Sequence, residues 1–232
     1  MRVAVCTFLA LICLSTVAAG QGKPRPNTKK KAGIAASKNA AASDPELGTV
    51  AGHTYSNQKF QFQVKVPDLW LIPDKDFEEY MKSRGFDLRL KAPETLDPAG
   101  QAKINRSVKN LKVLLTVYRS MPGTPNNAVM RISVEDLSLN PQINDAVDYL
   151  DAVRAELASL RLPVDLRYSQ TQAERLGELQ FGYIDVSTKA GKKRMYATVR
   201  EGHAILFTLT YYDDNDLETM RQILTDGNFH YK

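Results

Sequence analysis

The sequence predicts an α+β domain: a central antiparallel β-sheet flanked by helices in an α/β/α sandwich. Two observations indicate this class. Several segments alternate apolar and polar residues with the period of half-buried strands, and short turn sequences join most of them. Two further segments, 144–160 and 214–226, space their apolar residues with the period of a helix.

The first half of the predicted domain mixes strands with short helices. Residues 60–66 alternate Phe and Val with polar residues and end at a proline, which predicts a half-buried strand. Helices are predicted over 74–84 and from Asp97-Pro98 through 108, with a short strand at 86–90 between them. Residues 111–118, LKVLLTVY, are nearly all apolar, which predicts a central strand covered on both faces.

The second half is predicted to consist mainly of strands around one clear helix. Residues 129–139 return antiparallel to 111–118 and complete a long hairpin. The helix at 144–160 has one apolar stripe, formed by Ala146, Leu150, Val153, Leu157 and Leu160. Shorter strands are predicted at 164–168, 173–178, 179–188, 195–200 and 203–211, with a closing strand at Phe229 and Tyr231.

An acidic run precedes the last helix. Asp213, Asp214 and Asn215 are suitable N-caps, and Asp216 and Glu218 lie in the first turn, where the helix dipole favours negative charge. The same acids could ligate Ca²⁺, but the run lacks the glycine and the spaced ligands of a calcium loop. Capping therefore explains these acids better than a metal site does.

The chain is predicted to have three parts. Residues 1–19 have the charged start, apolar run and small-residue end of a secretory signal. Residues 20–51 are basic, rich in Lys, Ala and Pro, and poor in large apolar side chains, which predicts a disordered linker. Residues 52–232 are expected to form a single globular domain that is secreted or periplasmic.

Composition argues against several classes of function. Both cysteines lie in the predicted signal, which leaves the domain without a disulfide, a zinc–thiolate site or a cysteine nucleophile. From residue 52 onward 24 basic residues face 24 acidic ones, so no nucleic-acid partner is expected. His53, His203 and His230 lack the spacing of metal ligands. We therefore expect no catalytic, metal-binding or cofactor-binding residues, and no cofactor.

Two segments are candidate interaction sites. The turn-rich, partly apolar loop between the strands at 111–118 and 129–139 is the first, and it consists of Met121, Pro122, Gly123, Thr124, Pro125, Asn126 and Asn127. The second is Lys29, Lys30 and Lys31 in the linker, which could contact anionic lipid or cell-wall polymer. The alternatives are a flexible hairpin tip and a solvated spacer.

A third basic group lies at one predicted turn. Lys189, Lys192, Lys193 and Arg194 could meet an acidic partner. A solvated hairpin tip is the favoured interpretation, because runs of like charge are usually exposed to water.

Three features resemble the PsbP-like fold, which is named after an extrinsic subunit of photosystem II. They are a first strand that ends at Val66-Pro67 before Trp70, a segment with Gly191, Arg194 and Tyr196 before a strand, and a final strand, acidic cap and helix over 211–229. The resemblance extends from about His53 to the end of the sequence by order of elements, and it implies a central antiparallel sheet with flanking helices. It does not transfer a function, because characterised members of the fold bind different partners.

The sequence favours an exported, non-catalytic binding or assembly module of the cell envelope. Its expected partner is another envelope protein. The alternative is a small-ligand carrier or weak hydrolase with a pocket between the sheet and the helices.

Overall fold

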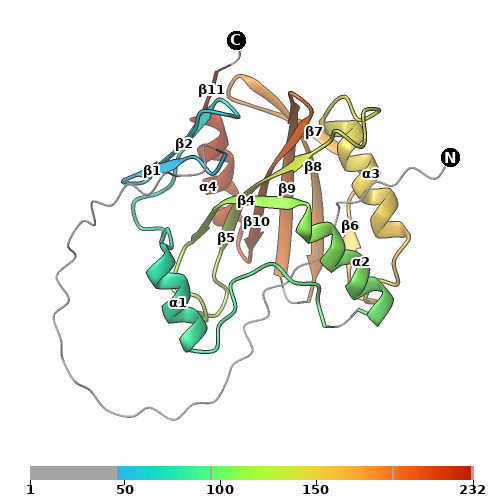
Figure 1. The fold of residues 1–232 in the computed structure, drawn as a ribbon, viewed down its shortest axis with the longest axis horizontal. Helices are drawn as coiled ribbons and strands as arrows, with labels where there is room; N and C mark the ends of the chain where they lie inside the picture. Colours follow the sequence, from blue (N-terminus) through green and yellow to red (C-terminus); the bar gives the residue numbers. More distant parts are fainter. Residues whose placement is uncertain (1–45, 95, 190, 231–232) are drawn as a thin grey trace.

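The computed structural model describes residues 46–94, 96–189 and 191–230 of the 232-residue chain. The predicted signal, most of the predicted linker including Lys29, Lys30 and Lys31, and Tyr231 lie outside these residues. Within them, two antiparallel sheets and four helices are stacked in layers (Figure 1). No helix in this part of the chain is long and apolar enough to cross a membrane.

The larger sheet has seven strands and forms the middle of the molecule. Its spatial order is β4 (Leu111–Tyr118), β5 (Val129–Asp136), β10 (His203–Tyr211), β9 (Gly191–Arg200), β8 (Leu179–Thr188) and β6 (Arg167–Tyr168), and β7 (Gln172–Leu176) also pairs with β8. All neighbouring strands are antiparallel. The β4–β5 hairpin therefore joins the rest of the sheet where β5 lies beside β10.

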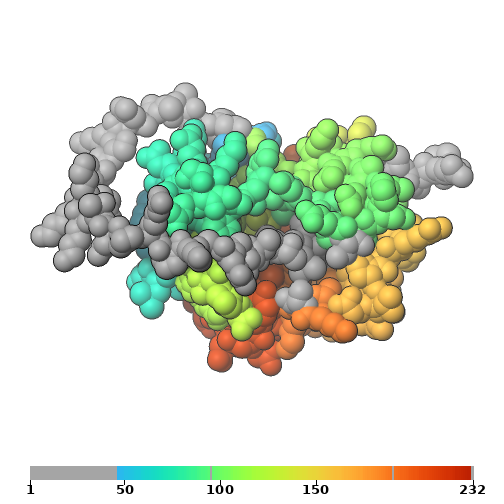
Figure 2. Space-filling model, turned by 90° about the horizontal axis from the view of Figure 1, so that it is seen from below, coloured from blue at the N-terminus to red at the C-terminus, as the bar shows by residue number. Residues whose placement is uncertain are grey.

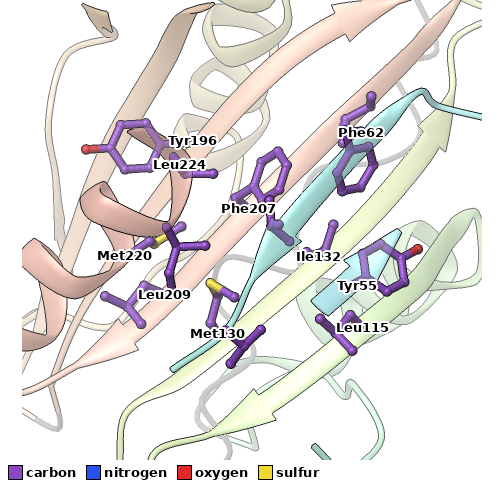
Figure 3. Close-up of a cluster of buried hydrophobic side chains, with 14 of the residues drawn as sticks. Tyr55, Phe62, Leu115, Met130, Ile132, Tyr196, Phe207, Leu209, Met220 and Leu224 are labelled. Atoms are coloured by element: carbon purple, nitrogen blue, oxygen red, sulfur yellow. The ribbon is translucent and has the colours of Figure 1, made fainter. Parts of the chain in front are cut away.

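One side of the large sheet, the first face, packs against a small sheet and a helix. The small sheet has the order β1 (Thr49–Ala51), β2 (Thr54–Asn57), β3 (Phe62–Lys65) and β11 (Asn228–Phe229), and the helix is α4 (Asp214–Thr225). Phe207 lies inside this core, with its ring centroid 5.6 Å from that of Phe62 and 6.1 Å from that of Phe229. Met220 and Leu224 of α4 close the same core (Figure 3).

The other side, the second face, is covered by α2 (Pro98–Lys109) and α3 (Ala146–Ala158). Leu150 and Leu157 of α3 are fully buried against it. The helix crosses β8 closely because Gly182 has no side chain, and a Cβ there would lie 3.0 Å from Leu150 Cδ1. Helix α1 (Lys75–Ser83) buries Met81, while Tyr80 stays 52% exposed. The predicted apolar side of α1 is therefore covered only in part.

The structure confirms the α+β class and most of the predicted elements. β8 and β10 have the predicted bounds, and β4 and β5 form the predicted hairpin. Helix α2 begins after Asp97, whose carboxylate accepts a hydrogen bond from the Gly100 N–H at 2.7 Å. The small sheet, which shares the first face with α4, was not expected as a separate layer.

One predicted short strand is absent, and another is shorter than predicted. Residues 86–90 form a loop, because Asp87 Oδ1 accepts a hydrogen bond from the Arg89 N–H at 3.1 Å and turns the chain locally. The strand predicted over 164–168 shortens to β6, since the Leu166 N–H donates to the Pro163 carbonyl at 3.0 Å within a turn.

β4 is an edge strand, although its apolar sequence predicted a central one. Both faces are covered as expected, because Val117 lies in the first-face core and Leu111 in the second-face core. On the side away from β5, Leu71 forms a single bridge to Tyr118. The apolar sequence of β4 therefore indicates that both of its faces are covered. It does not indicate that the strand has a neighbour on each side.

The folded part begins before the predicted boundary at residue 52. β1 pairs with β2, and the Asn57 side chain donates to the Glu46 carbonyl at 2.9 Å. Lys112 Nζ lies 2.6 Å from Glu46 Oε2. Residues 46–51, predicted to belong to the linker, are thus part of the domain.

Candidate functional site

Three connections gather at one end of the large sheet, which we call the loop end. They are the loop between β4 and β5, the turn between β8 and β9, and the link from β10 to α4. Strand pairing places them together, because Val129 lies opposite both Tyr118 and Thr210, and Lys192 lies opposite Tyr211. Figure 2 views this end from below and shows the lime-coloured loop beside the orange-red start of α4. The candidate loop 121–127 therefore has neighbours distant in sequence.

Loop 121–127 is exposed, and its backbone is held by hydrogen bonds. The Asn127 side chain accepts from the Ser120 N–H at 2.8 Å and donates to the Ser120 carbonyl at 2.6 Å. The Thr124 N–H donates to the Met121 carbonyl at 3.0 Å, which closes a turn. Met121 itself is 48% exposed. The loop thus presents an apolar side chain on a defined backbone.

Arg119 connects this loop to helix α4. Its Nη2 donates to the Asn126 carbonyl at 2.7 Å, and its Nη1 lies 2.6 Å from Asp216 Oδ1. Asp213 Oδ2 is a second, longer partner at 3.4 Å. Charge-assisted bonds of this kind are shorter and stronger than neutral ones. Arg119 therefore fixes the loop against the start of α4, a role that sequence reasoning did not assign to it.

The acidic run before α4 has two functions. Asp213 is the N-cap, and its Oδ1 accepts from the N–H groups of Asn215 and Asp216 at 3.0 and 3.1 Å. Asp216 is buried and paired with Arg119, so capping alone does not explain it. No three His, Cys, Asp or Glu side chains within the described ranges gather as metal ligands.

The basic group of the β8–β9 hairpin is only in part a solvated tip. Lys192 pairs with Asp214 at 3.2 Å, and Lys193 is buried. Arg194 binds Asp185 through two bonds of 2.7 Å and lies 4.2 Å from the centroid of the Tyr183 ring. The solvated interpretation therefore suits the exposed Lys189 and Lys192, and does not suit Lys193 and Arg194.

Arg194 and Tyr196 belong to a polar network beside the first-face core. The Tyr196 hydroxyl donates to Glu174 Oε2 at 2.6 Å, and Arg221 pairs with the other oxygen of Glu174. Burial, together with the hydrogen bond to Glu174, raises the pKa of Tyr196 above its usual value. These contacts give the Gly–Arg–Tyr segment a structural role at the junction of β7, β9 and α4.

A buried acid lies under α3. Glu135 of β5 is 1% exposed, and its Oε2 accepts a hydrogen bond from the Tyr149 hydroxyl at 2.9 Å. Its Oε1 has no hydrogen-bond partner among the described residues. Burial raises the pKa of Glu135 to about 8, and the bond from Tyr149 opposes that rise. An acid on the inward side of an apolar strand was the available signal, and sequence reasoning missed it.

The three histidines do not form a site. His203 begins β10, with Nδ1 2.8 Å from the Glu201 carbonyl oxygen. His53 precedes β2, and His230 follows β11.

The chain was compared with protein families, curated proteins and solved structures, and only solved structures resemble it. No protein-family model and no curated protein matches the chain. Among solved structures, the chain is similar to cyanobacterial PsbP (CyanoP) from Synechocystis sp. PCC 6803, with a TM-score of 0.41 and 15% identity over 79% of this chain and 99% of that one. A protein from Bacteroides thetaiotaomicron VPI-5482 gives a TM-score of 0.38 and 11% identity over 78% of this chain and 49% of its own. Both solved structures are under 25% identical to the chain, and neither transfers a role to it.

Proposed function

We propose that this protein is an exported, non-catalytic binding or assembly module of the cell envelope. Its domain contacts another envelope protein through loop 121–127. The observation that carries the proposal is that this loop is exposed while Arg119 and Asn127 hold its backbone. A loop that is already ordered loses less conformational entropy on binding.

Exposed apolar groups at the loop end support the same proposal. Met121 is 48% exposed, and Tyr212, in the link from β10 to α4, is 40% exposed. Methionine and tyrosine are enriched in protein interfaces relative to the rest of the surface. A partner seated on the loop end would cover both side chains.

The proposal is tested by site-specific photo-crosslinking in the native envelope. A photoreactive side chain at Thr124 is expected to capture a discrete partner. The same group at Glu201, an exposed turn residue at the opposite end of β10, is the matched control and should capture none. Identical capture from both positions would contradict the proposal.

The basic linker adds a second contact in this proposal. Lys29, Lys30 and Lys31 would attract anionic lipid or cell-wall polymer, each contributing up to about 1 kcal/mol near such a surface. The full chain with all three lysines changed to glutamate should bind anionic vesicles less tightly than the unchanged chain at low salt. High salt should remove the difference. Equal binding at low salt would leave the linker as a spacer.

A small-ligand carrier is the second candidate function. One observation favours it: part of the sheet face that packs toward the helices is lined by basic and hydroxyl-bearing side chains.

A further inference from the structure

Met121 is the one exposed methionine among the residues that the structure describes, and it lies in loop 121–127. It is 48% exposed. The other methionines of the described ranges are buried, with at most 2% of their surface exposed, and they are Met81, Met130, Met195 and Met220. No cysteine follows position 13 in the sequence. Within the described part of the chain, Met121 therefore presents the most accessible sulfur.

The backbone around Met121 is ordered without help from its side chain. The Met121 carbonyl accepts hydrogen bonds from the Thr124 N–H at 3.0 Å and from the Asn127 side chain at 3.2 Å. Arg119 holds the Asn126 carbonyl at 2.7 Å. All of these bonds reach backbone carbonyls. A chemical change at the sulfur would therefore leave the bonds that order the loop in place.

An accessible thioether is a target for peroxides. A lone pair of the sulfur attacks one oxygen of hydrogen peroxide, the O–O bond breaks and an S–O bond forms. The methionine loses two electrons and becomes a sulfoxide, while the peroxide is reduced and leaves as water. A buried methionine is reached only when the chain opens locally. Exposure should therefore direct the oxidant to Met121.

The sulfoxide changes what the loop offers to a partner. Oxidation converts a flexible apolar side chain into a polar one. A partner that covers Met121 would have to bury the new oxygen, which costs free energy unless a hydrogen bond is provided. Tyr212, the other exposed apolar group of the loop end, has no sulfur and would be unchanged. Oxidation would thus remove one of the two apolar contacts at this surface.

We propose that Met121 is a reversible oxidation site that controls binding at loop 121–127. Peroxide oxidises it while the domain stays folded, and the sulfoxide weakens the contact with the envelope partner. Methionine sulfoxide reductases reverse the change. This inference rests on the proposed function of the loop. A bound partner should in turn protect the sulfur, because binding and oxidation need the same surface.

The first measurement identifies the site of oxidation. The full chain is treated with hydrogen peroxide and digested, and each methionine is followed by mass spectrometry. Met121 should be oxidised at least about tenfold faster than Met130 or Met220, which react only through local opening. The oxidised chain should unfold in urea at the same midpoint as the untreated chain. Equal rates at the three positions, or a lower midpoint, would overturn the proposal.

The second measurement follows binding through a photoreactive side chain at Thr124. The purified chain is oxidised, freed of peroxide and added to isolated envelopes. Oxidation should lower capture of the partner at least about fivefold, because the sulfoxide oxygen must be buried. Treatment with both classes of methionine sulfoxide reductase, one for each sulfoxide epimer, should restore capture.

Two variants separate the sulfur of Met121 from other effects of peroxide. Met121→Leu keeps an apolar side chain, and its capture should be the same before and after peroxide. Met121→Gln places a polar side chain of similar length there and should capture as weakly as the oxidised chain. The proposal is overturned if the oxidised chain captures as much partner as the untreated chain, or if peroxide also lowers capture by Met121→Leu.

Failure of the proposed function gives a different result. If the untreated chain captures no partner, the docking role of loop 121–127 and its control by oxidation are both overturned. The oxidation rates from the first measurement would still decide whether Met121 is the reactive site.

Discussion

Arg119 and Asp216 are 97 residues apart in sequence, and their side chains meet at 2.6 Å. This contact ties the loop after β4 to the first turn of α4. Both partners are at least partly withdrawn from water, since their side chains are 34% and 4% exposed. The loop end is therefore held as one unit by an ion pair that neither segment could form alone.

Breaking this pair should loosen the loop and weaken the fold. Arg119→Met leaves the buried Asp216 carboxylate without its guanidinium, so we expect a loss of about 1–3 kcal/mol in the free energy of unfolding. Urea denaturation measures the loss, and hydrogen exchange should accelerate over 120–127. Lys65→Met, which removes an exposed pair with Asp68 at 4.0 Å, should cost less than about 0.5 kcal/mol. Equal losses would argue against a special role for Arg119.

Glu135 should make stability depend on pH. Its pKa is about 8 in the folded protein, against a usual value of 4.5. The unfolded chain therefore releases this proton at lower pH than the folded chain, and stability falls as the pH rises from about 5 to about 8. Glu135→Gln should remove that loss and gain stability over the unchanged protein across this range, by up to a few kcal/mol. Denaturation at pH 5 and pH 8 measures the difference, and Glu178→Gln, at an exposed carboxyl, should follow the unchanged protein.

Removing the hydroxyl of Tyr149 should destabilise the protein. Tyr149→Phe keeps the buried ring but removes the hydroxyl that donates a 2.9 Å hydrogen bond to Glu135, so we expect a loss of about 1–3 kcal/mol in the free energy of unfolding. Thermal unfolding at pH 6 measures it. Tyr80→Phe, at a half-exposed ring on α1, should change the midpoint little. A similar effect of both substitutions would show that the buried hydroxyl is unimportant.

Arg194→Lys should not be a conservative change. Lysine cannot reproduce the two bonds to Asp185 or the planar contact with Tyr183, so we expect a loss of about 1–2 kcal/mol in unfolding free energy. Arg175→Lys at an exposed position of β7 is the control and should be close to neutral. Loss of stability in both would indicate a general effect of arginine replacement.

The strands and helices could be predicted because their periodicity is local. The stripe of Leu150, Val153 and Leu157 identified α3 without reference to the rest of the chain. The position of β4 at the sheet edge could not be predicted. The pattern of apolar side chains indicates which faces of a strand are covered, but it does not indicate how many strands pair with its backbone. The small sheet was not predicted because two of its strands are too short to show a periodic pattern. β1 has three residues and β11 has two.

The candidate site could be predicted only where it lies on one segment. Loop 121–127 was found from its turn residues, but Arg119, which holds it, has no local pattern that distinguishes it from other arginines. Glu174 of β7 meets Tyr196 of β9 and Arg221 of α4 only because the strands and the helix pack together. Contacts of this kind depend on the tertiary structure.

The first-face core joins the two ends of the described chain. Phe62 of β3 pairs with Phe229 of β11, and their rings stack with centroids 6.0 Å apart. Removing a buried phenylalanine costs about 3–5 kcal/mol, a large part of the stability of a typical domain. A chain without Phe229 would therefore lack part of the first-face core. Loss of β11 should therefore weaken the packing of β3, although the two strands lie far apart in sequence.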